Sequence, residues 1–242
     1  MWQRLDRAVI GTAQEVAGKV RGALRRLIDV SHEIEAGMVT YPGLPAPVVS
    51  DYLSREASRA HYTAGTTFQI GRVEMVANTG TYIDAPFHRF ADGIDLAGLS
   101  LERLADVEGV LVDATERGGR AIDVDRFAGL DLRDRAVLVH TGWDAHWRTP
   151  QYGEDAPFVT GHAAELLVEA APALVGIDSV NLDDMQDGAR PAHTLLLGAG
   201  IPIVEHLCNL DELPSSGFRF HCAPVKFRGV GTFPVRAYAL VE

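Results

Sequence analysis

The sequence predicts one α/β domain built around a mixed β-sheet, and three observations support this fold class. Short β-branched runs alternate with turn residues along the chain, and one stretch has the apolar periodicity of a helix. No Ser/Pro-rich linker or internal repeat divides the sequence. The 242 residues, of which 47% are hydrophobic, are enough to bury a sizeable core without disulfides.

The first expected element is an amphipathic basic helix over residues 1–26. Six basic residues against two acidic ones give this stretch a charge of +4, in a chain of net charge −11. Its apolar residues fall at helical spacing: Val9, Ile10, Ala13, Val16, Ala17 and Val20. Such a helix suits a membrane surface or an oligomer contact, or it packs on its own domain or on a sister subunit. The small apolar side chains favour packing on protein.

Residues 27–242 are expected to form the domain itself. Compact apolar runs predict strands at 27–30, 68–77, 110–112, 137–140, 173–177, 201–204, 218–227 and 233–241. Ala163, Leu166, Leu167 and Ala170 share one face of a predicted helix over residues 161–170. This mixture of strands and helices is typical of a mixed sheet in a single domain.

The composition narrows the class of partner and the compartment. With 33 acidic and 22 basic residues, the surface repels phosphate backbones, so nucleic acid is not expected as a partner. Cys208 and Cys222 are too few for a disulfide framework and indicate buried thiols in a reducing compartment. No apolar run reaches the roughly 18–20 residues that span a bilayer. Arg4, Asp6 and Arg7 interrupt the start of the chain, which argues against a secretory signal. We therefore expect a cytoplasmic protein without a membrane partner.

Reactive side chains gather in residues 76–88, behind a predicted strand. Gly80 permits a sharp turn there, and Pro86 ends regular strand pairing. Asp84 and His88 are four residues apart, so a helical segment would place them on one face. A carboxylate beside an imidazole orients the ring and raises its basicity, as a general base requires. Pairs of this kind also occur as surface pairs or helix caps.

A second cluster follows between residues 190 and 206. If residues 201–205 form a strand, Glu205 points to the same side as Ile201 and Ile203. A buried carboxylate is costly unless it is paired, protonated or bound to a metal. Together with His193 and Asp84, Glu205 makes a ligand set suited to zinc, manganese or iron.

At these residues the chain resembles the metal-dependent cyclase/hydrolase family, which includes bacterial kynurenine formamidase and isatin hydrolase. The family signature is His-x-Gly-Thr-His-x-Asp-x-Pro-x-His, and residues 78–88 read NTGTYIDAPFH. Asn78 and Tyr82 replace the two leading histidines. His193 and Glu205, twelve residues apart, match a downstream pair of metal ligands in the formamidase branch. Further matching segments lie at 29–32, 141–143, 175–179 and 234–237, so the resemblance covers residues 27–242.

The resemblance implies an α/β domain of the swivelling β/β/α type, in which the mixed sheet curls into a β-barrel-like core with surrounding helices. It also implies a homo-oligomer, which we expect to be a homodimer or a homotetramer. In the binuclear members the first metal uses both leading histidines and the Asp, which here leaves Asp84 with Asn78 and Tyr82. The second metal would use Asp84, His193 and Glu205, all of which are present, and His88 matches the catalytic histidine of the family.

The leading hypothesis is therefore a hydrolase of an amide-like or lactone-like carbonyl in a small-molecule substrate. One divalent metal, zinc or manganese, on Asp84, His193 and Glu205 would lower the pKa of a bound water towards ~7. His88 would move the proton, and Tyr82 or Asn78 would donate a hydrogen bond to the developing oxyanion. Candidates for the substrate-binding wall are Trp143, Phe68 and Phe87.

Two alternatives use the same residues differently. In the first, no metal is needed: Asp84 orients His88, which activates water or abstracts a proton in a lactonase, dehydratase or cyclase. In the second, the chain keeps the fold as a binding protein and has lost catalysis. Both alternatives retain a pocket, and resistance of any activity to EDTA would favour the first.

Overall fold

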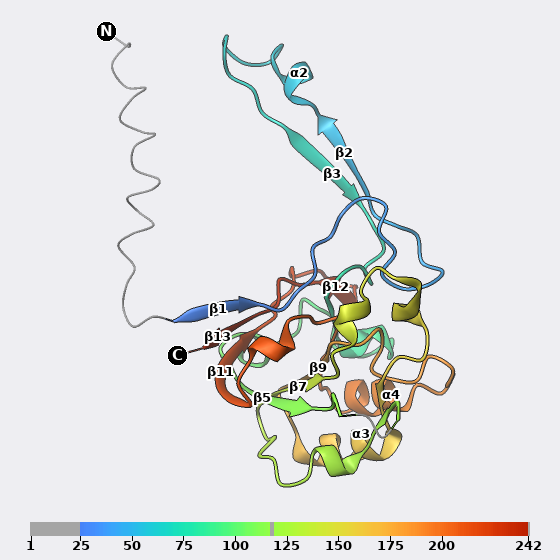
Figure 1. Cartoon of the computed structure of the whole chain (residues 1–242). Coiled ribbons are helices and arrows are strands. Elements are labelled where there is room, and N and C mark those ends of the chain that lie inside the picture. Colours follow the sequence, from blue (N-terminus) through green and yellow to red (C-terminus); the bar gives the residue numbers. More distant parts are fainter. Residues whose placement is uncertain (1–24, 117–118, 242) are drawn as a thin grey trace.

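The computed structural model describes residues 25–116 and 119–241 (Figure 1). The basic helix expected over residues 1–26 lies outside the described residues, apart from its last two positions. Of these, Arg26 already begins the first strand, β1. The described helices include none that is both long and apolar enough to cross a bilayer.

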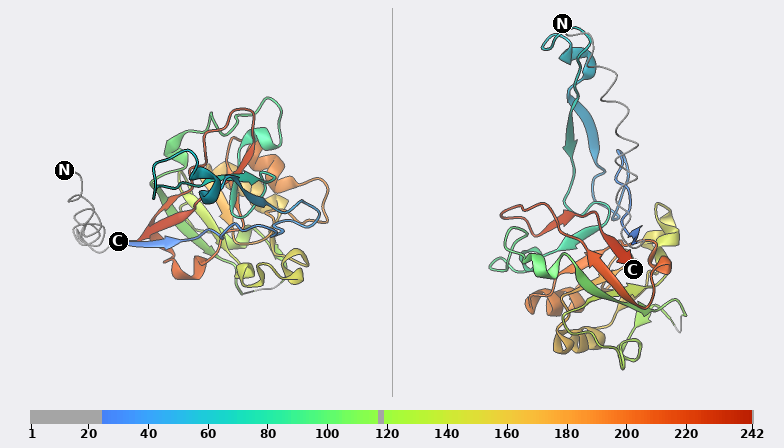
Figure 2. Two further views of the ribbon diagram at one scale, coloured as in Figure 1. Left: turned by 90° about the horizontal axis from the view of Figure 1, so that it is seen from above. Right: turned by 90° about the vertical axis from the view of Figure 1, so that its left-hand side faces the viewer.

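The body of the molecule is one mixed sheet of nine strands that curls into a half-barrel (Figures 1 and 2). The strand order is β1-β13-β11-β5-β7-β9-β10-β4-β12. Their bounds are β1 Arg26–Asp29, β4 Tyr82–Asp84, β5 Val107–Asp113, β7 Ala136–His140, β9 Leu174–Ile177, β10 Ile203–Glu205, β11 Ser216–His221, β12 Thr232–Pro234 and β13 Tyr238–Val241. The central strands β5, β7, β9 and β10 run parallel, and all other neighbours pair antiparallel. The predicted fold class, a mixed sheet with a barrel-like core, is confirmed.

The central strands are buried on both faces, as parallel strands are when both sides are covered. In β7, Val137 and Val139 pack into one apolar cluster, and Leu138 packs into another on the opposite face. The cluster that contains Val137 and Val139 is covered by α3 (Gly161–Ala170) and α4 (Pro191–Gly198). Burial of each such side chain contributes about 1.5–3 kcal/mol, so this core fixes the positions of the strand ends that carry the site.

Short elements complete the body. They are the strands β6 (Ala121–Ile122) and β8 (Phe158–Val159) and the 3₁₀ turns Pro86–His88, Leu101–Arg103, Val124–Arg126, Trp143–His146, Pro150–Gly153 and Leu210–Glu212. The helix predicted over 161–170 has these same bounds in the structure. The strand expected over 233–241 is instead two strands, β12 and β13, which pair with different neighbours. Pro234 ends the first one, because proline has no N–H to continue a ladder.

A two-stranded arm projects from the body (Figures 1 and 2). It consists of β2 (Val48–Leu53), β3 (Ile70–Glu74) and a tip that contains the short helix α2 (Arg55–Ser58). Every residue of the two strands except Leu53 is exposed. The strand predicted over 68–77 is therefore found only as β3, over Ile70–Glu74, and it lies in this arm instead of in the core.

Candidate active site

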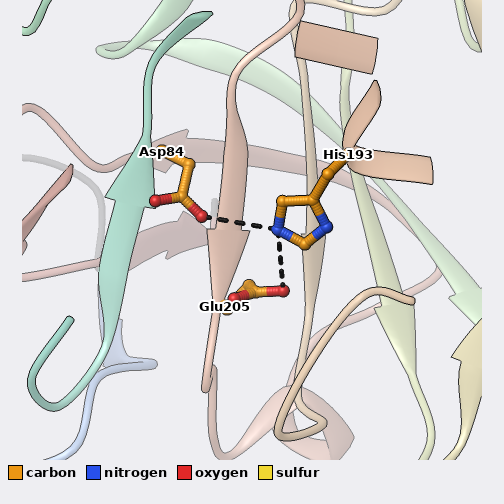
Figure 3. A group of neighbouring side chains, drawn as sticks. All are labelled: Asp84, His193 and Glu205. Carbon is orange, nitrogen blue, oxygen red and sulfur yellow. Dashed lines mark ion pairs between the residues drawn. The ribbon is translucent and has the colours of Figure 1, made fainter. Parts of the chain in front are cut away.

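Asp84, His193 and Glu205 converge from three elements (Figure 3). Asp84 ends β4, Glu205 ends the neighbouring strand β10, and His193 lies in the first turn of α4. All three are nearly inaccessible to solvent, at 0%, 1% and 7% exposure for Asp84, Glu205 and His193. His193 Nε2 lies 3.7 Å from Asp84 Oδ2 and 3.5 Å from Glu205 Oε1. The structure thus brings together the three residues that the sequence predicts as metal ligands.

Each of the three residues is anchored through its other polar atom. Asp84 Oδ1 accepts a hydrogen bond from the Thr232 hydroxyl on β12. His193 Nδ1 lies 2.7 Å from Asp183 Oδ2, and Glu205 Oε2 accepts a 2.8 Å bond from the Tyr82 hydroxyl. The other atoms of the three groups, Asp84 Oδ2, His193 Nε2 and Glu205 Oε1, face one another, and Glu205 Oε1 also accepts a 2.6 Å bond from the Leu182 N–H. Anchoring of this kind fixes the orientation of a metal ligand and the tautomer of a histidine.

The donor set fits a divalent cation. Two carboxylates and one imidazole place their ligating atoms within 4.8 Å of one another. Asp84 Oδ2 is buried and has no hydrogen-bond partner among the described residues. Because an unpaired buried carboxylate oxygen is costly, a cation between these atoms would satisfy a group that the protein leaves unsatisfied.

The electrostatics of the metal-free triad lead to the same conclusion. Burial raises the pKa of Glu205 above its usual range, although His193 opposes this shift. Burial by itself would lower the pKa of His193, but Glu205 and then Asp183 raise it above its usual value. Without a cation, the excess negative charge therefore favours a proton on the triad, and metal binding would displace that proton.

Asp183 is a residue that the sequence analysis did not assign to the site. Its carboxylate accepts from the backbone N–H groups of Ala192 and His193 at 2.6 and 3.0 Å, besides its contact with the His193 ring. It thereby satisfies free donors at the start of α4 and aims the imidazole at the same time. In the sequence, Asp183 belongs to an acidic turn after a strand. Hydrogen bonds within such a turn explain an aspartate there equally well.

The four-residue spacing would place Asp84 and His88 on one face of a helix, but the two residues do not share a helix. Asp84 ends a strand, and His88 follows on a 3₁₀ turn with its side chain 37% exposed. Thr232 lies between them: its hydroxyl donates to Asp84 and lies 2.8 Å from His88 Nδ1. Because the Thr232 proton is used by Asp84, His88 must donate from Nδ1, which leaves Nε2 as the basic nitrogen. A Cβ at Gly231 would lie 2.4 Å from the His88 backbone nitrogen, so only glycine allows this approach of β12.

Tyr82 occupies the other side of Glu205. Its hydroxyl donates to Glu205 Oε2 and lies 3.3 Å from His206 Nε2, while His206 Nδ1 lies 2.9 Å from the Tyr152 hydroxyl. His206 is fully buried, and this burial lowers its pKa to about 3, so its ring is neutral. The proton of Tyr82 is committed to Glu205. Tyr82 was one of the two candidates expected to donate a hydrogen bond to an oxyanion, and its proton is not free for this. Asn78, the other candidate, lines the cavity beside it.

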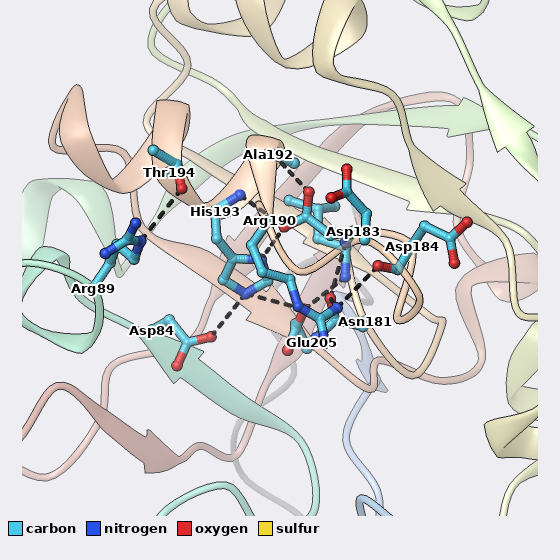
Figure 4. Close-up of polar contacts among 12 residues, drawn as sticks. Asp84, Arg89, Asn181, Asp183, Asp184, Arg190, Ala192, His193, Thr194 and Glu205 are labelled. Atoms are coloured by element: carbon cyan, nitrogen blue, oxygen red, sulfur yellow. Dashed lines mark hydrogen bonds and ion pairs between the residues drawn. The ribbon is translucent and has the colours of Figure 1, made fainter.

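A cavity of about 270 Å³ opens over the triad. It is lined by Tyr41, Leu44, Asn78, Tyr82, His88, Arg89, Asn181, Arg190, His193 and Glu205. Arg190 lines the cavity and donates to Asn181 Oδ1 at 3.1 Å (Figure 4). Arg190 also donates to the Tyr41 hydroxyl at 3.2 Å. Arg89 also lines the cavity, with its Nε 3.3 Å from Thr194 Oγ1 (Figure 4).

The three aromatic residues expected to form the substrate wall do not line this cavity. Trp143 is buried in a separate cluster, where its indole N–H donates to the Tyr152 carbonyl. Phe68 lies in the arm, where its ring contacts Tyr62. Phe87 lies on the 3₁₀ turn between Asp84 and His88.

Comparison with known proteins places this geometry in a family. The family model Cyclase, described as "Putative cyclase", matches residues 28–184. Kynurenine formamidase of Bacillus cereus is 26% identical over 216 residues, which is 87% of this chain and 95% of that protein. The Erythrobacter litoralis kynurenine formamidase is 27% identical over 206 residues, covering 84% and 88% of the two chains.

Solved structures have the same fold. Isatin hydrolase A from Labrenzia aggregata superposes with a TM-score of 0.76 at 22% identity and covers 96% of this chain and 97% of its own. A structure titled as a potential metal-dependent hydrolase with cyclase activity gives a TM-score of 0.70 at 27% identity, covering 90% and 98% of the two chains.

Proposed function

The chain belongs to the cyclase family, and on that premise we propose that it hydrolyses a carbonyl C–N bond, in a formamide or a cyclic amide, or opens a lactone, with one divalent metal. The observation that carries this proposal is the convergence of Asp84 Oδ2, His193 Nε2 and Glu205 Oε1. The similarity to proteins named kynurenine formamidase and isatin hydrolase supports an arylformamidase-like hydrolase.

Asp84, His193 and Glu205 would hold the metal, and zinc and manganese both suit two carboxylates and one imidazole. A bound divalent ion polarises a carbonyl oxygen and makes water a stronger nucleophile at neutral pH. The protein supplies the orientation: Asp183 aims His193, Thr232 holds Asp84, and Tyr82 holds Glu205.

His88 is the proton carrier in this proposal. Its Nδ1 proton is held by Thr232, so its Nε2 is free to accept a proton from the attacking water. The same nitrogen then delivers that proton to the leaving nitrogen or oxygen. With its side chain 37% exposed in the cavity lining, the ring is within reach of both substrate and solvent.

Asn78 is the neutral donor that remains for the oxyanion. Its side-chain amide lies in the cavity lining and has two donor hydrogens, so one remains when the other is used on the Tyr82 hydroxyl, whereas the Tyr82 proton is used by Glu205. A donor aimed at the developing negative charge is worth ~3–4 kcal/mol in a preorganised site.

The test is metal content together with activity. Protein purified without an affinity metal column is reloaded with zinc or manganese, and its metal content is measured by elemental analysis. We expect close to one metal per chain and hydrolysis of members of a formamide, cyclic amide and lactone panel, lost with a chelator and restored by the metal. Activity that resists EDTA in metal-free protein would favour the metal-free use of Asp84 and His88, and an inert, metal-free protein would favour a binding role.

A further inference from the structure

The two carboxylate oxygens of Glu205 have different partners. Oε1 lies 3.5 Å from His193 Nε2 and accepts from the Leu182 N–H at 2.6 Å. Oε2 accepts instead from the Tyr82 hydroxyl at 2.8 Å. Because Glu205 is nearly inaccessible to solvent, bulk water cannot replace this hydroxyl. Whatever holds the Tyr82 proton in its direction therefore decides which oxygen of Glu205 faces His193.

The sheet register places Tyr82 beside Glu205. The two residues are directly opposite each other on β4 and β10. Directly opposed residues of an antiparallel pair have their side chains on the same face, as close neighbours. The register does not set the direction of the hydroxyl proton, however, because a phenol O–H rotates about its C–O bond. Further contacts are needed to direct this proton to Glu205.

Two side chains supply these contacts by occupying the acceptor directions of the Tyr82 oxygen. His206 Nε2 lies 3.3 Å from this oxygen, and the Asn78 side chain also forms a hydrogen bond with it. A hydroxyl oxygen has two lone pairs and one proton. With both lone pairs used, the proton has one direction left, which is towards Glu205 Oε2. His206 therefore acts on Glu205 through Tyr82.

The His206 ring needs a partner of its own to present an N–H group to Tyr82. Its other nitrogen, Nδ1, lies 2.9 Å from the Tyr152 hydroxyl. A neutral imidazole has one donor and one acceptor nitrogen, so a proton donated by Tyr152 to Nδ1 places the ring proton on Nε2. Tyr152 is itself buried, and its carbonyl accepts from the Trp143 indole N–H at 2.9 Å. Each group thus donates to the next, from Tyr152 through His206 and Tyr82 to the carboxylate.

The backbone of His206 is in a conformation that histidine seldom adopts. Its φ of 57° lies in the left-handed region that favours glycine. Two contacts hold the backbone there: the His206 N–H donates to the Ser179 carbonyl at 3.3 Å, and the His206 carbonyl accepts from the Thr81 hydroxyl. Strain of this kind persists where the side chain has a function. The polar contacts of this ring are with Tyr152 and Tyr82, so the function that they indicate is to connect the two.

We propose that His206 and Tyr152 are positioning residues, which act through Tyr82 to hold Glu205 so that only Oε1 is left for the metal. This inference rests on the proposed function, since it concerns one ligand of the proposed metal. The described residues that line the cavity include Tyr82 and Glu205 but neither His206 nor Tyr152. The effect of these two residues on the site must therefore pass through Glu205.

Zinc affinity of the full chain, measured by competition with a chelator, tests the proposal. Tyr82→Phe keeps the ring but removes the proton that holds Oε2, and it should lose roughly 10–100-fold in affinity. Tyr152→Phe leaves Tyr82 in place and should lose less. Tyr238→Phe is the matched control and should lose none. Tyr238 also contacts a histidine, since it stacks on His221 at a centroid distance of 4.5 Å, but it is not in the cavity lining.

Two substitutions of His206 separate the hydrogen-bond chain from the fold. His206→Gln carries its amide to about the depth of imidazole Nε2, where it can donate to Tyr82. His206→Asn carries its amide only to the depth of Nδ1, where it can accept from Tyr152 but cannot reach Tyr82. Asparagine adopts the left-handed conformation more readily than glutamine, so a role in folding alone would favour His206→Asn.

The hydrogen-bond chain predicts the opposite order for zinc affinity. His206→Gln should retain most of the affinity, and His206→Asn should lose roughly 10-fold or more. Circular dichroism checks that each variant is folded before its affinity is measured. If either His206 variant fails to fold, Tyr82→Phe against Tyr238→Phe still decides the question. Higher affinity in His206→Asn than in His206→Gln would overturn the proposal.

Cobalt substitution gives a readout that is independent of affinity. The visible absorption of bound Co²⁺ depends on the number and arrangement of its ligands. Release of Glu205 from Tyr82 should therefore change the spectrum of Tyr82→Phe and leave that of Tyr238→Phe as in the wild type. An unchanged spectrum in Tyr82→Phe, or wild-type zinc affinity in Tyr82→Phe and His206→Asn, overturns this inference alone. A wild type that binds no metal overturns the proposed function with it.

Discussion

On one side of Glu205 the site is ionic, and on the other side it is neutral. His193, Asp84 and Asp183 bring three titratable groups together within hydrogen-bond or ion-pair distance. Across Glu205, Tyr82 and His206 form a chain that carries no charge, because burial raises the pKa of Tyr82 well above its usual value and lowers that of His206 to about 3. The comparison shows how a buried site can concentrate charge where a cation is needed and fix geometry elsewhere without adding charge.

The largest expected effect comes from the residue shared by both sides. Glu205→Gln keeps one acceptor oxygen, which can serve the Leu182 N–H, turns its amide nitrogen towards the Tyr82 hydroxyl, and removes the negative charge. We expect metal binding and kcat/KM to fall by more than roughly 100-fold, beyond the range for groups that only orient a ligand. Elemental analysis and steady-state kinetics measure this, with exposed Glu154→Gln as the control. Full metal content in Glu205→Gln would remove Glu205 from the ligand set.

A variant of His88 distinguishes the loss of proton transfer from the loss of metal binding. His88→Gln should lower kcat by about 10²–10⁴-fold, the usual contribution of general acid–base catalysis. Metal content should stay unchanged, because His88 lies outside the triad and its side chain is 37% exposed. Loss of the metal in this variant would show that His88 belongs to the ionic side as a ligand.

Asp183 orients the His193 ring from outside the triad of Asp84, His193 and Glu205. Asp183→Asn removes the charge that orients His193 and should weaken metal affinity by roughly 10–100-fold. Asp187→Asn, at an exposed position on the same loop, is the control. Chelator competition measures both variants, and equal affinities would show that backbone contacts of α4 are enough to aim His193.

The last effect concerns the stability of the aromatic cluster behind the neutral side, not metal binding or turnover, and it appears as a pH dependence. Burial lowers the pKa of His32 to about 4, and its ring stacks on Trp147, which in turn contacts His206. The folded-state pKa is below the unfolded value of 6.5, so its contribution to stability is present above pH 6.5 and is lost as pH falls towards 4. The change is roughly 3 kcal/mol at most. Urea unfolding at several pH values should show a shallower acid loss for His32→Gln than for exposed His162→Gln; equal slopes would contradict this.

Local patterns were enough to predict the central strands and α3, because β-branched runs and a helical period act over a few residues. The triad was also predictable, since Asp84 lies in a motif and His193 and Glu205 keep a family spacing. Thr232 and Asp183 were not, because each reaches the site from a segment without a local signal of its own. The strand predicted over 68–77 resembled a core strand, because an apolar pattern over a few residues does not reveal that β3 lies exposed in the arm.

The arm is joined to the cavity at both of its strands. Leu44 lies four residues before β2 begins, and Asn78 lies four residues after β3 ends, and both line the cavity. The arm and the cavity are therefore connected through two separate short segments of the chain. A substitution that changes the backbone of either segment should therefore affect the arm and the space above Asp84, His193 and Glu205 together.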